Sequence, residues 1–162
     1  MKPIKIPEKT IQGISIRTTN ANEMNPETAK IATLYEDFDK NIVVDYQHGA
    51  RVYGVYFDYE SDASGQFSVL AGADRIESST VELQQAKIVA GDYLVFKGEG
   101  EMPQAVIDTW MKIWDFFSEG NTSKKADKNT ENSIEYKRAY KTDFEFYKSE
   151  SQVEIHIGIE KS

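Results

Sequence analysis

An acidic residue stands among aromatic residues near the end of the chain, in the stretch TDFEFYKS. Aromatic residues favour β-strands, in which alternate side chains share a face. Glu145 should therefore share one face with Asp143 and Tyr147, and Phe144 and Phe146 should lie on the other. A carboxylate beside aromatic rings can bind an organic cation, because each ring face adds an attraction of roughly 0.5–2 kcal/mol.

The same pattern has a simpler interpretation. An acid that alternates with aromatic residues is also typical of the solvent-facing side of an antiparallel strand, and the residues alone favour that interpretation. The two hypotheses differ in the surroundings that they require. A ligand-binding Glu145 should be semi-buried and should have no ion pair with Arg51, Arg138 or a lysine.

Nothing else in the sequence indicates catalytic or metal chemistry. The chain has no cysteine, which excludes thiolate catalysis, disulfides and cysteine-ligated metals. Its two histidines are far apart: we expect His48 in a loop, and His156 on a strand, where it faces solvent or is hydrogen-bonded. We therefore predict no catalytic residue, no metal and no cofactor.

Composition narrows the class of partner. The 162 residues suit a single domain over 1–162, and 27 acidic against 19 basic residues give a net charge of −8. Such a charge repels nucleic acid and suits cationic or neutral partners. No stretch resembles a secretory signal or a transmembrane helix. We expect a cytoplasmic protein without membrane contact, monomeric because the duplication described below already joins two halves.

The first half of the chain predicts a strand, a helix and a hairpin. Residues 9–19 alternate as a strand does, and Asn25 and Pro26 favour a helix start, with the helix running to about residue 40. A connection over 44–51 is followed by strands over 52–60 and 66–74, and residues 76–85 form a polar crossover.

The second half repeats this order. A strand over 86–100 precedes a helix that begins near Pro103, a mobile polar insert covers about 118–133, and strands over 136–147 and 152–160 form a second hairpin. The apolar face of the helix consists of Val106, Trp110, Ile113, Trp114 and Phe117.

The order β-α-β-β therefore occurs twice, over about 9–76 and 86–160. Leu34-Tyr35 parallels Ile113-Trp114, and Phe57-Asp58-Tyr59 parallels Phe144-Glu145-Phe146. This predicts an α+β fold with pseudo-two-fold symmetry and a mostly antiparallel sheet. Two helices should cover one face, above Phe144 and Phe146. The opposite face should form a ligand cleft between the halves.

Three segments carry a resemblance to a known family: VYGVYFDYESDASGQFSVLAGAD, VAGDYLVFKGEGEMPQAVIDTWMKIWDFF and KRAYKTDFEFYKSESQVEIHIGI. In this order they resemble the GyrI-like small-molecule-binding family, the effector-binding domain of AraC- and MerR-type regulators. The resemblance implies a pocket between the halves that takes lipophilic cations, with an acid in a motif like F-E-x-Y, here Glu145. No helix-turn-helix precedes the segments, so we expect a stand-alone member that does not bind DNA.

These observations predict a ligand site around Glu145. Asp58 shares its expected face by repeat symmetry alone, so a solvent-facing role is favoured for it. Trp110 and Trp114, spaced i and i+4, are also typical of a helix core. The predicted ligand-binding residues are Glu145, Tyr147, Trp110, Trp114, Tyr56 and Tyr93.

Three functions remain open at this point. The first is a receptor that captures lipophilic or aromatic cations in an aromatic cleft. The second is a GyrI-like hydrolase that opens strained rings, which needs Glu145 as one acid and a second acid not yet assigned. The third is a protein–protein inhibitor, which needs a large exposed apolar patch, and none is visible in the sequence.

Overall fold

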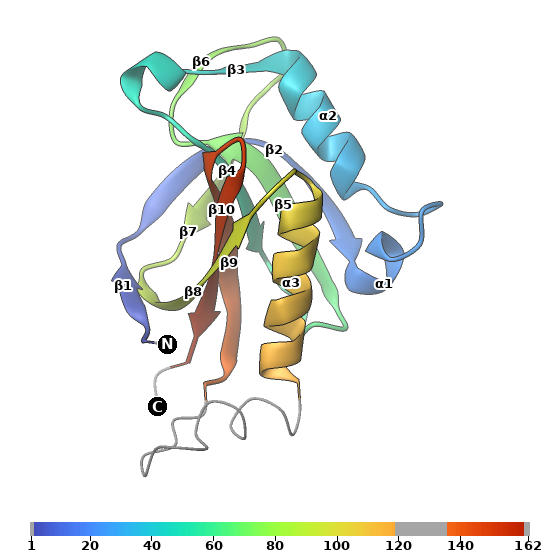
Figure 1. Cartoon of the computed structure of the whole chain (residues 1–162). Helices are drawn as coiled ribbons and strands as arrows, with labels where there is room; N and C mark the ends of the chain where they lie inside the picture. The colour runs from blue at the N-terminus through green and yellow to red at the C-terminus, as the bar shows by residue number, and fades with distance from the viewer. Residues whose placement is uncertain (1, 119–135, 161–162) are drawn as a thin grey trace.

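The structure is a computed structural model that describes residues 2–118 and 136–160. The chain runs through a curled sheet with helices against it (Figure 1). The elements of the described part are β1 (Ile4–Ile6), β2 (Lys9–Thr19), α1 (Asn20–Glu23), α2 (Ile31–Asn41), β3 (Ile42–Val44), η1 (Tyr46–His48), β4 (Val52–Phe57), β5 (Gln66–Ala73), β6 (Ile76–Ser79), β7 (Gln84–Ile88), β8 (Gly91–Glu99), α3 (Gln104–Phe117), β9 (Arg138–Ser149) and β10 (Gln152–Ile159).

The main sheet is antiparallel, and its strand order is symmetric. The order is β1-β8-β10-β9-β4-β5-β2-β7. On each side of the central β4–β9 pair, the sheet contains one hairpin and then the strand that precedes a helix. These are β4–β5 and β2 in the first half, and β9–β10 and β8 in the second half. This order confirms the predicted α+β fold with two β-α-β-β halves related by a pseudo-two-fold axis.

The two edge strands are exchanged between the halves. β1, which precedes the first half, pairs with β8 of the second, and β7, which precedes the second half, pairs with β2 of the first. The prediction missed β1 and joined β7 to β8 as one strand over 86–100. That was wrong because the chain turns at Val89 and Ala90, and β7 lies at one edge of the sheet, whereas β8 is the second strand from the other edge.

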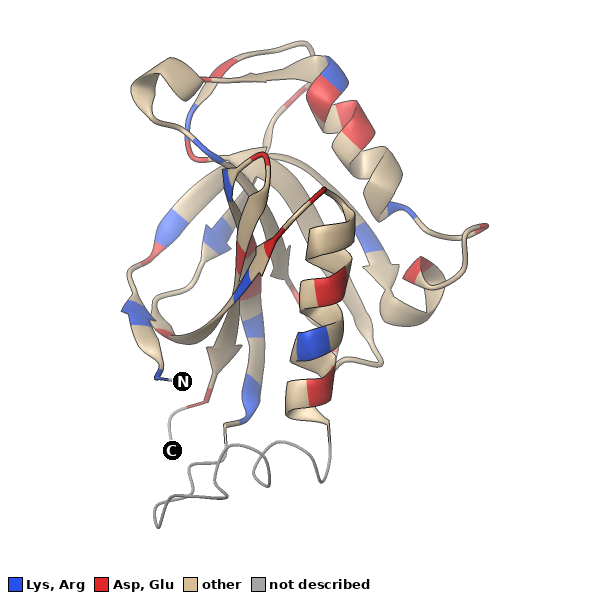
Figure 2. Cartoon of the chain, viewed as in Figure 1, with Lys and Arg blue, Asp and Glu red and all other residues tan. Residues whose placement is uncertain are grey.

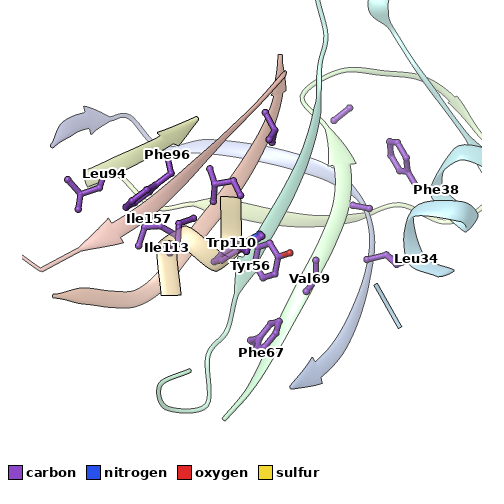
Figure 3. Close-up of a cluster of buried hydrophobic side chains, with 14 of the residues drawn as sticks. Leu34, Phe38, Tyr56, Phe67, Val69, Leu94, Phe96, Trp110, Ile113 and Ile157 are labelled. Atoms are coloured by element: carbon purple, nitrogen blue, oxygen red, sulfur yellow. The ribbon is translucent and has the colours of Figure 1, made fainter. Parts of the chain in front are cut away.

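Both longer helices pack on the same face of the sheet, as predicted. α2 packs on β2 and β5 of the first half, and α3 packs on β8 and β10 of the second. Figure 3 shows Trp110 and Ile113 of α3 directed at the strands, with Leu34 and Phe38 of α2 on the far side of Tyr56 and Val69. The helices and this face of the sheet therefore enclose one apolar core.

The other face of the sheet is not a free cleft. It carries a second buried cluster, which includes Tyr53, Val55, Leu70, Tyr93 and Phe144. Ile88 of β7 and Ile11 of β2 belong to the same cluster, since the sheet curls and its edge strands come back towards its middle. The expectation of an open cleft on the face opposite the helices was therefore wrong.

The start of α2 also differs from the prediction. Asn25 and Pro26 lie in a turn, where the Asn25 side chain accepts a hydrogen bond from Glu27 N at 3.0 Å. The helix begins at Ile31, and its first backbone N–H groups donate to the carboxylate of Glu23. A distant acid thus satisfies the N-terminal donors that a local capping residue usually satisfies.

Two further segments differ from expectation or fall outside the structure. Residues 76–79 were expected in a crossover and residue 44 in a connection, but residues 42–44 and 76–79 pair as the small two-stranded sheet β3–β6. The insert predicted over about 118–133 lies outside the described residues, apart from Ser118.

His156 is buried rather than solvent-facing. It is 6% exposed, and its ring stacks on Phe144 with centroids 4.2 Å apart. Its Nδ1 has no hydrogen-bond partner among the described residues. Burial lowers the pKa of the imidazole below its ordinary value, so the folded protein holds His156 neutral.

This burial predicts a stability loss at mildly acidic pH. Near pH 6.5 the unfolded chain takes up a proton on His156 that the folded chain does not bind. The contribution of the neutral, buried imidazole to the free energy of unfolding is therefore complete above pH 6.5, and it is lost as the pH falls below that value. One proton gives a slope of at most about 1.4 kcal/mol per pH unit. Urea unfolding of the wild type and of His156→Phe on both sides of pH 6.5 measures it. Equal slopes in the two proteins would contradict the prediction.

Candidate functional site

The central strand pair brings Glu145 to the helix side of the sheet. β4 and β9 pair antiparallel, and Glu145 lies directly opposite Gly54. The neighbouring position on β10 is Ile155, which belongs to the core under the helices. The prediction placed Phe144 and Phe146 beneath the helices. The structure places them in and against the second cluster, on the face opposite Glu145.

Four neutral donors surround the Glu145 carboxylate. The hydroxyls of Tyr35 and Tyr147 each donate to Oε1 at 2.9 Å. The Tyr56 hydroxyl donates to Oε2 at 2.8 Å, and Trp110 Nε1 donates to the same oxygen at 2.7 Å. Every strong hydrogen-bonding position of the carboxylate is therefore taken by an aromatic side chain.

These donors come from both halves of the chain. Tyr35 lies on α2, Tyr56 on β4, Trp110 on α3 and Tyr147 on β9. Their rings also contact one another: Tyr56 and Trp110 have centroids 5.1 Å apart, and Tyr35 and Tyr147 have centroids 6.1 Å apart, both with edge-to-face geometry. Glu145 and its donors thus lie between the two halves, at the central β4–β9 pair.

The tyrosines of the site are held as neutral donors. Burial first, and then the charge of Glu145, raise the pKa values of Tyr35, Tyr56 and Tyr147 well above the usual range. All three hydroxyls therefore keep their protons at physiological pH. The network combines one acid with proton donors that carry no positive charge.

Glu145 is more deeply buried than the semi-buried position predicted for it. It is 1% exposed. No ion pair between Glu145 and a basic side chain occurs within residues 2–118 and 136–160, and Arg138 pairs with Asp143 instead. Arg51 directs its guanidinium to the Ala50 carbonyl. A ligand-binding role would have been contradicted by full exposure of Glu145 or by an ion pair between Glu145 and a basic side chain. Neither is found in the described chain.

Gly54 creates the space in which the carboxylate and its donors meet. A Cβ atom at this position would lie 2.1 Å from the Tyr35 hydroxyl and 2.5 Å from Oε1 of Glu145. The backbone angles of Gly54 are those of an ordinary strand, so the need for glycine comes from packing and not from conformation.

The aromatic wall reaches the surface along α3. Trp114 is 39% exposed, and its ring centroid is 6.2 Å from that of Trp110, which is buried. Tyr35 and Tyr147 are half-buried. A path of aromatic rings therefore leads from solvent to the buried acid, with Trp114 at its outer end.

Two other residues that were considered for the site, Tyr93 and Asp58, lie elsewhere. The structure does not bring Tyr93 to Glu145: its ring packs on Phe144, and its hydroxyl donates to the Val89 carbonyl at 2.6 Å. Tyr93 borders a hollow of about 360 Å³ that Glu145 and its donors do not line. Asp58 follows the end of β4, and its exposed side chain lies 3.6 Å from Arg17. Asp58 is therefore a surface residue, which is the role favoured for it above.

Sequence reasoning missed two residues of the site, Tyr35 and Gly54. The internal repeat already matched Tyr35 with Trp114, so a search for aromatic residues at equivalent positions of the two halves could have found Tyr35. Gly54 gave no signal, because its importance depends on two side chains that are distant in sequence.

The described part of the chain contains no group of histidine and acidic residues that could hold a metal ion. None of its helices is long and apolar enough to cross a membrane.

Comparison with known proteins places the chain among effector-binding proteins. The profile of a family described as integron-associated effector binding protein matches residues 4–159. An integron cassette protein from the mobile metagenome of Vibrio cholerae is 39% identical, with a TM-score of 0.80 over 98% of this chain and 94% of that one. No curated protein matches.

More distant structures share the fold. SAV2435, solved bound to tetraphenylphosphonium, has a TM-score of 0.61 at 15% identity and covers 98% of this chain and 93% of its own. A putative bacterial transcription regulation protein from Staphylococcus aureus has a TM-score of 0.62 at 14% identity and covers 99% and 97%. These two similarities concern the fold.

Proposed function

Because the chain belongs to the family of integron-associated effector-binding proteins, we propose that it binds lipophilic aromatic cations at Glu145. The distant relative SAV2435, which shares the fold, was solved with such a cation, tetraphenylphosphonium. The proposed ligand-binding residues are Glu145, Tyr35, Tyr56, Trp110, Trp114 and Tyr147.

One observation carries this proposal: a buried carboxylate whose described partners are all neutral and aromatic. A buried charge normally has a cationic partner, because removing it from water is expensive. Here the aromatic donors hold the charge without cancelling it. A cation that enters the site gains both the ion pair and the faces of the surrounding rings.

The ring arrangement suggests how a ligand reaches the acid. Tyr35 and Tyr147, which share Oε1, are half-buried, whereas Tyr56 and Trp110, which share Oε2, are buried. The outer pair can move and exchange its hydrogen bonds for water, while the inner pair keeps the carboxylate oriented. Oε1 is therefore the oxygen that we expect to face the cation.

The charge of the surrounding surface supports the same class of ligand. Figure 2 shows acidic residues along α2 and α3, the two helices that cover the site. Glu36, Asp37 and Asp39 of α2 are exposed, as is Asp108 of α3. Together with the net charge of −8, they create a potential that attracts cations toward this side of the molecule.

The hydrolase alternative is less well supported by the geometry. Such a reaction needs a second acid that is free to position water. Asp143 shares the face of Glu145, but it accepts hydrogen bonds from Arg138, Tyr59 and the Gly158 backbone. No second acid is therefore available beside Glu145 in the described chain.

Binding by Glu145→Gln tests the proposal. Titration of the protein with tetraphenylphosphonium or N-methyl-4-phenylpyridinium should change the fluorescence of Trp110, whereas neutral 4-phenylpyridine should bind more weakly. We expect Glu145→Gln to lower cation affinity roughly 30- to 1,000-fold, because the ion pair is lost and the cation is left desolvated.

The matched control is Glu154→Gln, the same change on the neighbouring strand. The Glu154 side chain contacts Lys148 at 3.9 Å and points to the opposite face from Glu145. This variant should bind like the wild type. If Glu145→Gln is folded and binds the cations as tightly as the control, the proposed site is wrong.

A further inference from the structure

A second buried carboxylate, Asp143, accompanies Glu145. It is fully buried and lies two residues earlier on β9, so the two acids share a face roughly 6–7 Å apart along the strand. The cross-strand neighbour of Asp143 is Tyr56, whose hydroxyl binds Glu145. Tyr56 thus borders both carboxylates.

Asp143, unlike Glu145, has a cationic partner. Arg138 Nη2 donates to its Oδ2 at 2.6 Å, the Tyr59 hydroxyl donates to the same oxygen, and Gly158 N donates to Oδ1 at 2.9 Å. The Arg138 side chain is 7% exposed and lies over the Tyr140 ring, 4.5 Å from its centroid. Its Nε has no hydrogen-bond partner among the described residues. Asp143 is therefore the acid that Arg138 neutralises.

The neutralised pair is connected to the proposed site by a row of rings. The Tyr59 ring packs on Phe67 with centroids 5.9 Å apart, and Phe67 packs on Tyr56 at 5.7 Å. Charges separated by packed rings rather than by water interact strongly, because the local dielectric is low. The two acids and Arg138 therefore act on a bound ligand together, as a single net negative charge.

We propose that Arg138 determines the charge specificity of the site: by neutralising Asp143 it makes the site select singly charged aromatic cations over doubly charged ones. This inference rests on the proposed cation-binding function. A doubly charged ligand forms an ion pair with Glu145 through one of its charges. Its second charge has no free carboxylate to pair with, because Asp143 is already paired with Arg138.

Removal of Arg138 changes this balance in a measurable way. Asp143 then either stays ionised, as a second negative charge beside the ligand, or takes up a proton because it is buried without a partner. In the first case a dication gains a second ion pair. In the second case its binding expels the proton from the Asp143 carboxyl into the buffer. Both cases improve dication binding relative to monocation binding.

Two cations of nearly equal shape provide the test. N-methyl-4-phenylpyridinium carries one charge, and N,N′-dimethyl-4,4′-bipyridinium carries two on a similar pair of rings. Isothermal titration calorimetry measures both affinities, and repetition in buffers of different ionisation enthalpy measures proton release. We expect the wild type to prefer the monocation, and Arg138→Gln to shift the affinity ratio toward the dication by about tenfold or more.

Conservative and compensating variants separate charge from structure. Arg138→Lys should keep the wild-type ratio, since it keeps the charge. The double variant Arg138→Gln with Asp143→Asn should also keep it, since both charges are removed. If Arg138→Gln does not fold, Asp143→Asn serves instead: it leaves Arg138 unneutralised, so monocation affinity should fall about tenfold or more.

Several results would overturn the inference. One is an equal loss of both affinities in Arg138→Gln, which indicates a purely structural role. Others are a wild type that does not discriminate between the two cations, or unchanged monocation affinity in Asp143→Asn. A different result, in which the wild type binds neither cation or Glu145→Gln binds both normally, removes the proposed function itself.

Discussion

Replacement of Glu145 by leucine is expected to lower the free energy of unfolding by about 2–6 kcal/mol. The substitution removes the acceptor of four hydrogen bonds. Tyr35 and Tyr147 are half-buried and can turn toward water, but Tyr56 and Trp110 are buried. Each of these two donors is left unpaired, which costs about 1–3 kcal/mol. Urea unfolding followed by circular dichroism measures the loss.

A competing effect works against this result. Exchange of a buried charge for an apolar side chain removes its desolvation penalty, and replacement of a whole buried ion pair is often neutral. Such a replacement is neutral only when the charged group and all of its hydrogen-bonding partners are replaced together. Glu145→Leu removes the acceptor but keeps its four donors. In a Tyr56→Phe background the same substitution should therefore cost about 1–3 kcal/mol less. An unchanged or raised stability of the single variant would mean that the four hydrogen bonds do not offset the cost of burying the charge.

Gly54→Ala is expected to abolish the contact between Tyr35 and Glu145 and to lower cation affinity about tenfold or more. The new methyl group takes the space 2.1 Å from the Tyr35 hydroxyl and 2.5 Å from Glu145 Oε1. Tyr35 can yield, because it lies half-buried on α2, whereas Glu145 is enclosed on all sides. The methyl group then stands beside the oxygen that we expect to face the ligand. Overpacking of this kind costs about 1–3 kcal/mol of stability.

A tyrosine titration identifies the displaced residue. Burial and the charge of Glu145 raise the pKa of Tyr35 well above its usual value in the wild type. In Gly54→Ala the displaced hydroxyl should ionise at lower pH, nearer that usual value, as ultraviolet absorbance would record. Tyr35→Phe combined with Gly54→Ala removes one of the two clashes and should recover part of the lost stability. Wild-type binding and an unchanged Tyr35 titration in Gly54→Ala would contradict the packing that we describe.

The sequence by itself singled out Glu145 as a candidate ligand-binding acid. An acid next to Phe144, Phe146 and Tyr147 is a local pattern, so it can be recognised from the sequence without knowledge of the fold. The strand–helix–hairpin order and its repetition are likewise local, because alternation and helical spacing are properties of short stretches. The family resemblance covered most of the chain, and the match over residues 4–159 confirms membership among effector-binding proteins.

The tertiary structure decided which face of the sheet carries Glu145. Alternation shows that Glu145 and Phe144 point in opposite directions, but it cannot show which of them faces the helices. The prediction chose Phe144, and the structure shows Glu145. The choice depends on the curl of the sheet, which fills the far face with a second core through the exchanged strands β1 and β7.

The set of residues that surround Glu145 was also decided by the tertiary structure. Tyr35 precedes Glu145 by 110 positions, and Gly54 matters only because both side chains converge on it. Arg138 was considered as a partner for Glu145 and instead pairs with Asp143. Which buried acid keeps its charge unpaired follows from long-range packing, and on that choice the proposed ligand specificity depends.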